Sequence, residues 1–420
     1  MKLTVIGGGS TYTPELADGL ARLDLPVSEL VLVDPDLDRL AAVGPVSARI
    51  MARYGHPARV RWTASLDDGA DGADAVLIQL RIGGQAARQR DETWPLDCGC
   101  VGQETTGAGG FAKALRTVPV VLDLAERLSR RASPYAPIID FTNPVGIVTR
   151  ALLTAGYPAI GLCNVAIGFQ RKFAALLGVS PSRVSLGHVG LNHLTWERSV
   201  LVDGVDVLPG LLADHVKEIS EDIELPPWLV QHLGMVPSYY LRYFYAHDLV
   251  VDSLAGARTR AEAVMEVEAE LLRQYADPAL DTKPEALTKR GGAFYSEAAV
   301  DLLVALTGSG PGDAASPQVV NVLNGGTLPF LPADAVVEVP ASVSPSGAVA
   351  LPVPPVEPLL RGLISHVFAY EELALDAALH GGRERVFNAL LAHPLVGQYD
   401  VAEGLTDRLL AENARYLSWA

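Results

Sequence analysis

Short apolar runs and amphipathic stretches alternate along the first part of the chain. The apolar runs are rich in β-branched residues and occupy residues 2–6, 29–33, 74–80, 136–141 and 158–162. After the first run, Leu16 and Leu20 recur at helical spacing, with Thr13 as the expected N-cap and Pro14 in the first turn. A longer helix is expected over residues 110–130. Continuous apolar strands that alternate with helices are typical of a parallel sheet covered on both faces.

The pattern changes beyond residue 180. Residues 183–196 partly alternate between apolar and polar positions, and a hairpin is expected around the turn Asp203-Gly204. Helices are expected at 255–276, 295–307 and 357–418, with loops and short strands at 308–356. We therefore predict an α/β chain with an N-terminal Rossmann-type doubly wound parallel sheet over residues 1–180. A C-terminal α+β domain over residues 181–420 would bind the substrate and a metal.

Composition narrows the class of protein. A chain of 420 residues has room for about two domains, and 49% hydrophobic residues with 20% charged residues exclude a disordered or fibrous chain. The net charge of −16 repels nucleic acid and anionic lipid, so we expect neither as a partner. Three cysteines are too few for a disulfide framework, no signal peptide is recognisable, and no apolar stretch reaches the roughly 20 residues of a membrane span. A cytoplasmic protein is expected.

A glycine turn follows the first predicted strand. Gly7 and Gly9 match the first two glycines of a dinucleotide-binding motif, while Tyr12 occupies the third place. Glycines let a pyrophosphate approach the backbone, and the helix that follows offers free N–H groups and a positive dipole end. Asp34 ends the second strand, where a carboxylate can bind ribose hydroxyls and favour NAD over NADP. The alternative is a plain structural turn.

Other polar residues follow the remaining strands of the predicted sheet. The strand-end residues are Gly7, Asp34, Arg81, Asn143 and the pair Cys163-Asn164. In doubly wound sheets, ligands bind outside the carboxyl ends of the strands, so these residues outline a crevice. Turns are generally polar, so each of these residues, taken alone, could equally be an ordinary turn residue without a role in binding.

Several other residues admit two interpretations. Cys163 and His193 could serve as metal ligands or as buried core residues. The tyrosines of PSYYLRYFY, at 239, 240, 243 and 245, are by default packing aromatics. The run Lys289-Arg290-Gly291-Gly292 could bind a phosphate or be an exposed pair of charges.

The motifs taken together resemble glycoside hydrolase family four, the NAD- and divalent-metal-dependent glycosidases. The resemblance extends over nearly the whole chain through VIGGGSTYTPEL, RIGGQAARQRDETWPL, VGQETTGAGGFAKALRTVPVVLDL, FTNPVGIVTRAL, GLCNVAIGF, GLNHL, YLRYFY and LTKRGGAFYS. The pair Cys163-Asn164 resembles the 6-phospho-β-glucosidase branch. Ala166, where related members often have proline, and Cys98 and Cys100 depart from the family pattern, and the two cysteines have no role that we can assign.

The resemblance implies roles for individual residues. Mn²⁺ or another divalent metal would be held by Cys163 and His193, and Tyr240 would be the base at the sugar C2. Catalysis would also involve Asn164 and Glu104. The expected NAD-binding residues are Gly7, Gly9, Ser10, Thr11, Asp34, Arg81 and Asn143, and the expected contacts to the phosphorylated sugar come from Arg88, Asn143, Asn164 and Arg290. A homodimer or homotetramer is also implied.

The implied mechanism differs from the two-carboxylate scheme of most glycosidases. NAD⁺ takes hydride from C3, and the resulting ketone makes the C2 proton acidic. The metal stabilises the enolate, a base removes the C2 proton, and the aglycone leaves from C1. Water then adds and NADH returns the hydride. Tyrosine ordinarily has a pKa of about 10, so it is protonated at neutral pH. To act as a base, Tyr240 would need the metal or Arg242 to lower its pKa.

Three alternatives remain at this point. A lactate/malate-type 2-hydroxy-acid dehydrogenase shares the glycine turn, and TNPV at 142–145 is similar to its signature. A non-catalytic nucleotide-binding module would have no need for Cys163, His193 and Tyr240 together. A family member could also act on an unphosphorylated or an α-linked sugar.

Overall fold

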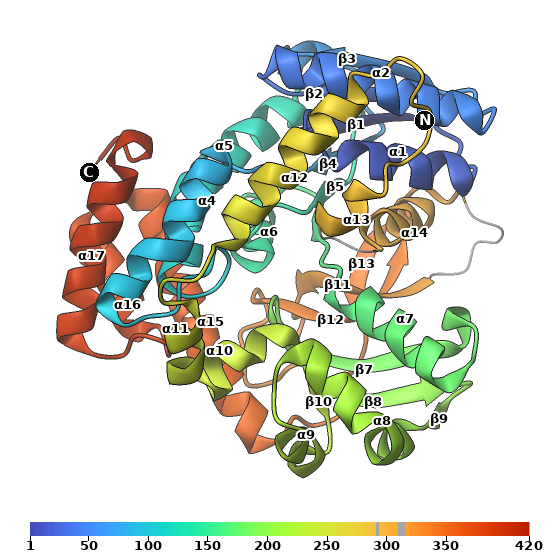
Figure 1. Ribbon diagram of the computed structural model, residues 1–420. Coiled ribbons are helices and arrows are strands. Elements are labelled where there is room, and N and C mark those ends of the chain that lie inside the picture. The colour runs from blue at the N-terminus through green and yellow to red at the C-terminus, as the bar shows by residue number, and fades with distance from the viewer. Residues whose placement is uncertain (291–293, 310–315, 420) are drawn as a thin grey trace.

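The computed structural model describes residues 1–290, 294–309 and 316–419 (Figure 1). Within these residues, nine strands form one sheet in the order β13-β12-β11-β6-β5-β4-β1-β2-β3. The parallel part comprises β1 (Lys2–Ile6), β2 (Glu29–Val33), β3 (Arg59–Thr63), β4 (Ala75–Ile78), β5 (Ile138–Asp140) and β6 (Ala159–Gly161). Its order, 3-2-1-4-5-6, is the one found in dinucleotide-binding folds. The expected Rossmann-type α/β sheet is confirmed.

One strand of this sheet was not indicated by the pattern of apolar residues. Strand β3 has the sequence RVRWT and forms the edge beside β2. Both of its arginines are at least partly exposed, so the strand lacks the continuous apolar run of its buried neighbours.

The helices between these strands and directly after β6 are α1 (Thr13–Arg22), α2 (Leu37–Arg53), α3 (Leu66–Ala70), α4 (Gly84–Thr93), α5 (Gly107–Ser129), α6 (Val145–Thr154) and α7 (Val165–Leu177). The two expected from the sequence, near Leu16 and over residues 110–130, are α1 and α5. The prediction that Thr13 is the N-cap of α1 is wrong, because Tyr12 occupies that position and Thr13 is the first helical residue. The Thr13 hydroxyl donates instead to the carbonyl oxygen of Gly8 at 2.9 Å, which ties the helix to the preceding turn.

A smaller antiparallel sheet follows α7. It consists of β7 (Val184–Leu191), β8 (Leu194–Val202), β9 (Val205–Asp206) and β10 (Val236–Pro237), and the expected hairpin at Asp203-Gly204 is confirmed by the pairing of β8 with β9. Helices α7, α8 (Leu208–Ile223) and α9 (Pro227–Leu233) pack with this sheet around a separate apolar core. Since α7 leaves strand β6 and buries its phenylalanines in the second core, its first turn lies at the junction of the two.

The chain then returns to the first sheet. Strands β11 (Ser316–Leu323), β12 (Val336–Ser344) and β13 (Gly347–Ala350) extend that sheet in antiparallel fashion beyond β6. The helices before them are α10 (Arg242–Tyr245), α11 (His247–Leu254), α12 (Arg260–Tyr275), α13 (Ala286–Arg290) and α14 (Tyr295–Thr307). Helix α12 packs on α2 and α4, and α14 packs on α1. Strands from the first and the second halves of the sequence therefore build one sheet.

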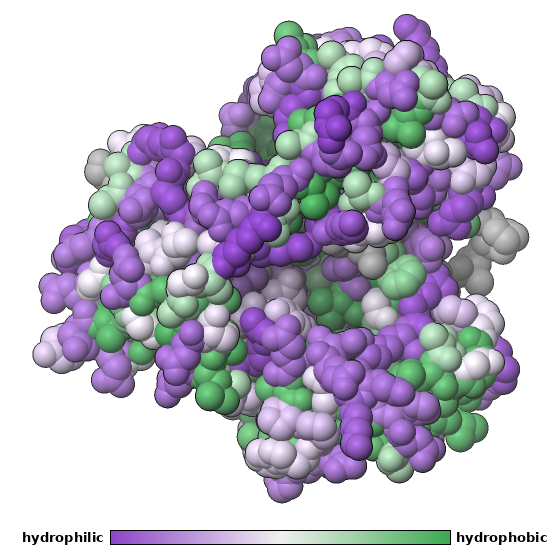
Figure 2. All heavy atoms as spheres, in the orientation of Figure 1, coloured by the Kyte–Doolittle hydropathy of each residue, from purple (hydrophilic) through white to green (hydrophobic). Residues whose placement is uncertain are grey.

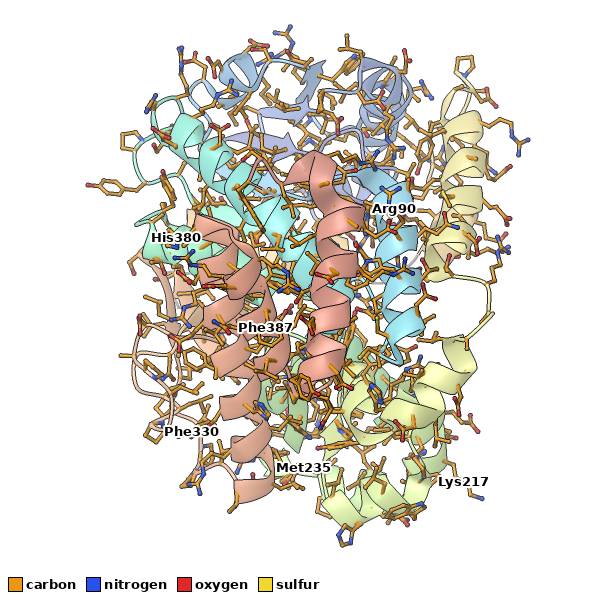
Figure 3. All side chains as sticks on the ribbon, turned by 90° about the vertical axis from the view of Figure 1, so that its left-hand side faces the viewer. Arg90, Lys217, Met235, Phe330, His380 and Phe387 are labelled. Atoms are coloured by element: carbon orange, nitrogen blue, oxygen red, sulfur yellow. The ribbon has the colours of Figure 1, made fainter. Side chains whose placement is uncertain are left out.

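Three helices complete the chain: α15 (Pro358–His380), α16 (Arg383–Ala392) and α17 (Tyr399–Asn413). Figure 3 shows them side by side against α4 and α5, in agreement with the contacts of α15 and α17 with α5. Among the described residues, no helix has both the length and the apolar character needed to span a membrane.

Candidate active site

The turn between β1 and α1 packs closely on β2. The N–H groups of Gly7 and Gly8 both donate to the carbonyl oxygen of Val33 at 2.9 Å, and the N–H of Gly9 donates to Asp34 Oδ2 at 3.1 Å. A Cβ atom on Gly8 would lie 2.9 Å from the backbone nitrogen of Val33. The turn thus requires glycine at position 8, which the motif comparison did not single out, as well as at Gly7, where φ is +84°.

The other residues expected at the dinucleotide lie in or beside this turn. The hydroxyl of Ser10 accepts a hydrogen bond from the N–H of Tyr12 at 3.2 Å. Thr11 is fully buried, and its carbonyl oxygen accepts from the hydroxyl of Tyr275 at 2.7 Å. Asp34 is oriented by the turn, so its carboxylate stands at the carboxyl end of β2. Their contact with a nucleotide stays a prediction.

Three neighbouring strands, β4, β5 and β6, present polar residues at the same edge of the sheet. Arg81 follows β4, Asn143 follows β5, and Cys163 and Asn164 follow β6 directly before α7. The side-chain oxygen of Asn143 is buried without a hydrogen-bond partner among the described residues. A buried polar atom of this kind is normally satisfied, and a bound ligand would do so here. Figure 2 shows a hollow between the upper and lower parts of the molecule, with apolar side chains at its floor.

Glu104 is the centre of a buried charge cluster. Its carboxylate pairs with Arg81, with Lys113 Nζ at 2.8 Å and with Arg88 Nε at 3.1 Å. Burial alone would raise the pKa of Glu104, but these three cations hold that pKa well below its usual range. Burial also lowers the pKa of Lys113 to about 8, although Glu104 opposes that shift. Glu104 therefore carries a negative charge that positions two guanidinium groups.

Cys163, His193 and Tyr240 are brought together from three distant segments. The imidazole of His193 stacks on the ring of Tyr240, with centroids 3.7 Å apart and planes 8° from parallel. Cys163 is close enough to Tyr240 that a thiolate there raises the pKa of the tyrosine hydroxyl. Burial raises the pKa of the thiol, and burial lowers the pKa of His193 to about 4, so the imidazole is neutral. Among the described residues, no set of three or more His, Cys, Asp or Glu side chains forms a metal-type cluster.

The pKa of the Tyr240 hydroxyl is raised by the protein, whereas a lowered pKa was expected for a base. Burial, followed by the charges of Cys163, Tyr243 and Glu104, raises the pKa of Tyr240 well above 10, and Arg88 opposes the rise. The hypothesis that Arg242 lowers this pKa is wrong. The Arg242 guanidinium lies instead over Tyr239, 4.5 Å from the ring centroid, and over Tyr243. Arg88 is instead the cation whose charge acts to lower the pKa of Tyr240.

A buried network of hydrogen bonds and ion pairs contacts Cys163 through the side chain of Asn192. The amide of Asn192 hydrogen-bonds the thiol and donates to Glu338 Oε2 at 2.8 Å. His188 lies between two carboxylates, with Nδ1 2.6 Å from Glu197 and Nε2 3.1 Å from Glu338. Burial alone would lower the pKa of His188, but these carboxylates raise it to about 10, so it is an imidazolium. The network fixes the Asn192 amide that touches the expected metal ligand.

Arg290 lies beside the glycine turn. Its guanidinium contacts Glu268 Oε1 at 3.1 Å and the Thr11 hydroxyl at 3.4 Å. Burial lowers the pKa of Arg290, Glu268 opposes this, and the nearby charges of Arg81 and Arg88 lower it further. Three guanidinium groups thus share one region, as an anionic ligand would require. Gly291 and Gly292 of the expected phosphate loop lie outside the described residues.

The sequence interpretation missed several residues that the fold adds to this region. They are Gly8, Gln103, Thr105, Lys113, His188, Asn192, Glu338 and Tyr295. Thr105 and Asn192 lie inside motifs that were recognised, so proximity to the motif was an available signal. Glu338 is on β12 and no local signal marks it.

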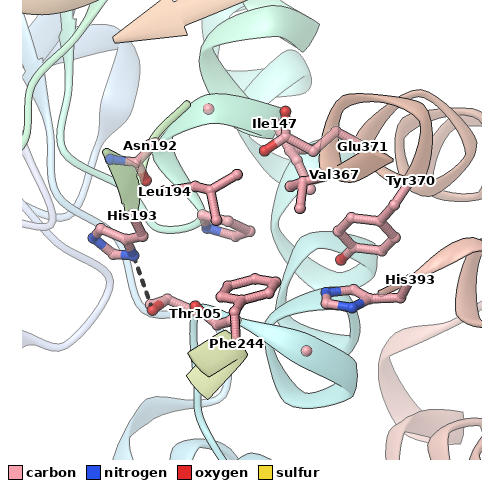
Figure 4. A pocket seen from close by; sticks show the side chains of 14 residues that line it. Thr105, Ile147, Asn192, His193, Leu194, Phe244, Val367, Tyr370, Glu371 and His393 are labelled. Carbon is pink, nitrogen blue, oxygen red and sulfur yellow. Dashed lines mark hydrogen bonds between the residues drawn. The ribbon is translucent and has the colours of Figure 1, made fainter. Parts of the chain in front are cut away.

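A pocket borders the other side of His193 (Figure 4). Thr105 and His193 line it at one end, and Tyr370, Glu371 and His393 line it at the other. Burial raises the pKa of Glu371 to about 8 and lowers that of His393 to about 3. At neutral pH the pocket therefore holds a largely uncharged carboxyl group and a neutral imidazole.

Cys98 and Cys100 contribute nothing to this site. All three cysteines are free. Cys100 is buried, and its thiol donates a weak hydrogen bond to the carbonyl oxygen of Leu395 at 3.7 Å, as is usual for a small buried cysteine.

Comparison with known proteins identifies relatives over the whole length. The model of the family 4 glycosyl hydrolases matches residues 2–179, and that of the family 4 glycosyl hydrolase C-terminal domain matches residues 188–396. A Bacillus subtilis (strain 168) protein named probable 6-phospho-beta-glucosidase is 37% identical, with 99% of this chain and 97% of that protein covered.

Comparison with solved structures also finds 6-phospho-beta-glucosidases among the similar proteins. The 6-phospho-beta glucosidase from Thermotoga maritima with manganese, NAD⁺ and glucose-6-phosphate has a TM-score of 0.90 and 31% identity, over 99% of both chains. Malate dehydrogenase from Salinibacter ruber has a TM-score of 0.56 and 17% identity, over 91% of this chain and 99% of that one. That second similarity shows a shared fold alone.

Proposed function

Because this chain belongs to the family 4 glycosyl hydrolases, we propose that it hydrolyses 6-phospho-β-glucosides with NAD and a divalent metal as cofactors. The similar B. subtilis and T. maritima proteins carry that name, and the T. maritima structure contains NAD⁺, manganese and a phosphorylated sugar. The single observation that carries the proposal is the meeting of Cys163, His193 and Tyr240 at the carboxyl edge of a dinucleotide-binding sheet. The dehydrogenase alternative is not supported.

The side chains present suit the two cofactors. When bound, NAD supplies reversible hydride transfer at the sugar C3 and a divalent metal supplies Lewis-acid polarisation of the sugar oxygens. The residues proposed to hold NAD are Gly7, Gly9, Ser10, Thr11, Asp34, Arg81 and Asn143. Cys163 and His193 would hold the metal, because a neutral imidazole and a thiolate both bind divalent transition-metal ions, and the sugar oxygens would add the oxygen ligands that Mn²⁺ prefers. A cation at this position would favour the thiolate that burial alone disfavours.

Tyr240 is proposed to remove the proton from C2. Its hydroxyl is buried next to Cys163, and Arg88 is the protein cation that favours the phenolate. A positioned base contributes about 10²- to 10⁴-fold in rate. Asn164, at the N-terminus of α7, is proposed to line the sugar site. Glu104 acts by holding Arg88 and Arg81 in place.

The 6-phosphate is proposed to bind at Arg88 and Arg290. Both guanidinium groups are largely buried, and the charge of Arg88 lowers the pKa of Arg290, so the pair is suited to a dianion. Arg290→Gln should raise KM for a phosphorylated substrate by roughly ten-fold or more, the loss expected for a charged hydrogen bond of about 1.5–3 kcal/mol. Arg258→Gln, at an exposed arginine paired with Glu266, is the matched control and should leave KM unchanged.

The test is a panel of p-nitrophenyl glucosides, α- and β-linked, with and without 6-phosphate, assayed with NAD⁺ and Mn²⁺. The proposal expects release of p-nitrophenol from the β-linked phosphorylated compound alone, without accumulation of NADH. Turnover of the unphosphorylated or the α-linked compounds would overturn the substrate assignment. Tyr240→Phe should lower kcat by about 100-fold or more, whereas Tyr239→Phe should not.

Three broader expectations belong to the same proposal. We propose that the protein is cytoplasmic and forms a homodimer or homotetramer. Three free cysteines support the reducing compartment, and the family resemblance supports the oligomeric state. We also propose a division into an NAD-binding part, residues 1–180, and a substrate- and metal-binding part, residues 181–420. The two family models, which end at residue 179 and begin at residue 188, support that boundary.

A further inference from the structure

The edge of the His193 ring is held by a residue from another part of the chain. His193 Nδ1 lies 3.1 Å from the hydroxyl oxygen of Thr105, and the two residues are 88 positions apart in sequence (Figure 4). Thr105 lies in the loop before α5, whereas His193 lies in the turn between β7 and β8. The face of the same ring is covered by Tyr240. Two independent contacts therefore define where the imidazole points.

The hydrogen bonds of Gln103 determine the direction of the Thr105 hydroxyl. Gln103 Oε1 accepts the backbone N–H groups of Thr105 and Thr106, the latter at 2.8 Å, so this atom must be the amide oxygen rather than the nitrogen. The Thr105 hydroxyl lies 2.9 Å from the same oxygen. Because an amide oxygen can only accept, the Thr105 hydroxyl donates its single hydrogen to Gln103.

This direction fixes the tautomer of His193. A hydroxyl that has donated its hydrogen has only lone pairs left, so the N–H of the imidazole must be on Nδ1 and must donate to Thr105. A histidine binds a metal as the neutral imidazole. With the hydrogen on Nδ1, the lone pair is on Nε2, the nitrogen on the far edge of the ring from Thr105.

The backbone conformation of His193 is also unusual, and it helps to determine where the imidazole points. Its φ is +63°, in the left-handed region that non-glycine residues seldom adopt. Leu191 pairs with Leu194, so Asn192 and His193 form a two-residue turn between the strands. The turn therefore places Asn192 against Cys163 and directs His193 toward Thr105.

We propose that Thr105, oriented by Gln103, is a positioning residue that holds His193 in the tautomer with Nε2 free and directs that nitrogen at the divalent cation. The proposal rests on the proposed function, since it takes His193 as a metal ligand. Outer residues of this kind contribute about 10- to 100-fold to metal affinity in other metal sites.

The first measurement uses wild-type enzyme without metal. Long-range ¹H–¹⁵N spectra of ¹⁵N-histidine-labelled protein report which ring nitrogen carries the hydrogen, and the signal of His193 is the one lost in His193→Gln. The inference expects the hydrogen on Nδ1. A hydrogen on Nε2 would overturn it, and this readout depends on neither metal nor activity.

The second measurement is Mn²⁺ affinity, followed by the electron paramagnetic resonance signal of free Mn²⁺. Thr105→Val keeps the shape of the side chain and the backbone bonds to Gln103 but removes the hydroxyl. It should weaken Mn²⁺ binding by about 10- to 100-fold and give a mixture of His193 tautomers, whereas Thr105→Ser should match wild type in both. Equal Mn²⁺ affinity in wild type and Thr105→Val would overturn the inference. Wild-type enzyme that binds no Mn²⁺ would instead overturn the proposed metal site, so the two failures are distinguishable.

Discussion

The carboxyl group of Glu371 makes stability depend on pH. It lines the pocket beside Thr105 and His193, and burial raises its pKa from an ordinary value of 4.5 to about 8, although Arg150 opposes this. Below pH 4.5 the group is protonated in both the folded and the unfolded chain. Between pH 4.5 and 8 the unfolded chain ionises and the folded chain does not. The free energy of unfolding therefore falls as pH rises through this window.

The size of the effect follows from the shift. Each pH unit in the window removes about 1.4 kcal/mol, so at pH 7 the loss is at most roughly 3 kcal/mol. Glu371→Gln cannot ionise, and it should be as stable as wild type near pH 4.5 and more stable at pH 7. For 420 residues, an unfolding entropy of about 2.1 cal/mol/K per residue converts 3 kcal/mol into a rise in Tm of about 3 °C.

Differential scanning calorimetry between pH 4.5 and 8 is the assay. The quantity compared is the Tm of the variant minus the Tm of wild type, because other buried acids such as Asp140, whose pKa burial raises to about 8, affect both proteins equally. Glu384→Gln, at an exposed position in the first turn of α16, is the control and should show no dependence of this difference on pH. A difference for Glu371→Gln that stays constant from pH 4.5 to 8 would refute the reasoning.

Two further predictions concern the dinucleotide turn and the charge cluster. Gly8→Ala places a Cβ 2.7 Å from the Cα of Leu32, which should cost about 1–3 kcal/mol and weaken NAD⁺ binding at least ten-fold in a fluorescence titration. Gly168→Ala, where nothing lies within 4 Å, should do neither, and equal NAD⁺ affinity in both variants would contradict the packing argument. Glu104→Gln leaves the buried Lys113 without its counter-charge, so it should lower the free energy of unfolding by about 3–5 kcal/mol. A thermal unfolding profile that matches wild type would show that the cluster contributes no net stability.

The fold was largely predictable because its core strands are apolar throughout. Strand β1 and strand β2 have the predicted bounds, and the glycine turn between β1 and α1 was recognised from its residues. Strand β3 was missed because its exposed edge carries arginines. That β11 to β13 join the first sheet could not be predicted, because the pairing of Asn321 with Gly161 joins segments with no shared local pattern.

The site was predictable only where a motif carries the chemistry. The motifs contain Cys163, His193 and Tyr240, and the fold brings these together. Their support was not predictable, because it depends on tertiary approach. Glu338 reaches the Asn192 amide from a strand far along the chain, and Arg242 was assigned to Tyr240 from sequence adjacency although its side chain points to Tyr239.

The most direct test of the account is hydrolysis of a 6-phospho-β-glucoside in D₂O, with NAD⁺ and Mn²⁺, followed by mass spectrometry and NMR of the released sugar phosphate. If Tyr240 removes the C2 proton before the glycosidic bond breaks, the product formed in D₂O carries deuterium at C2. The same reaction should slow when the substrate carries deuterium at C3. A product with its original hydrogen at C2, formed at a rate that does not depend on NAD⁺, would contradict the account.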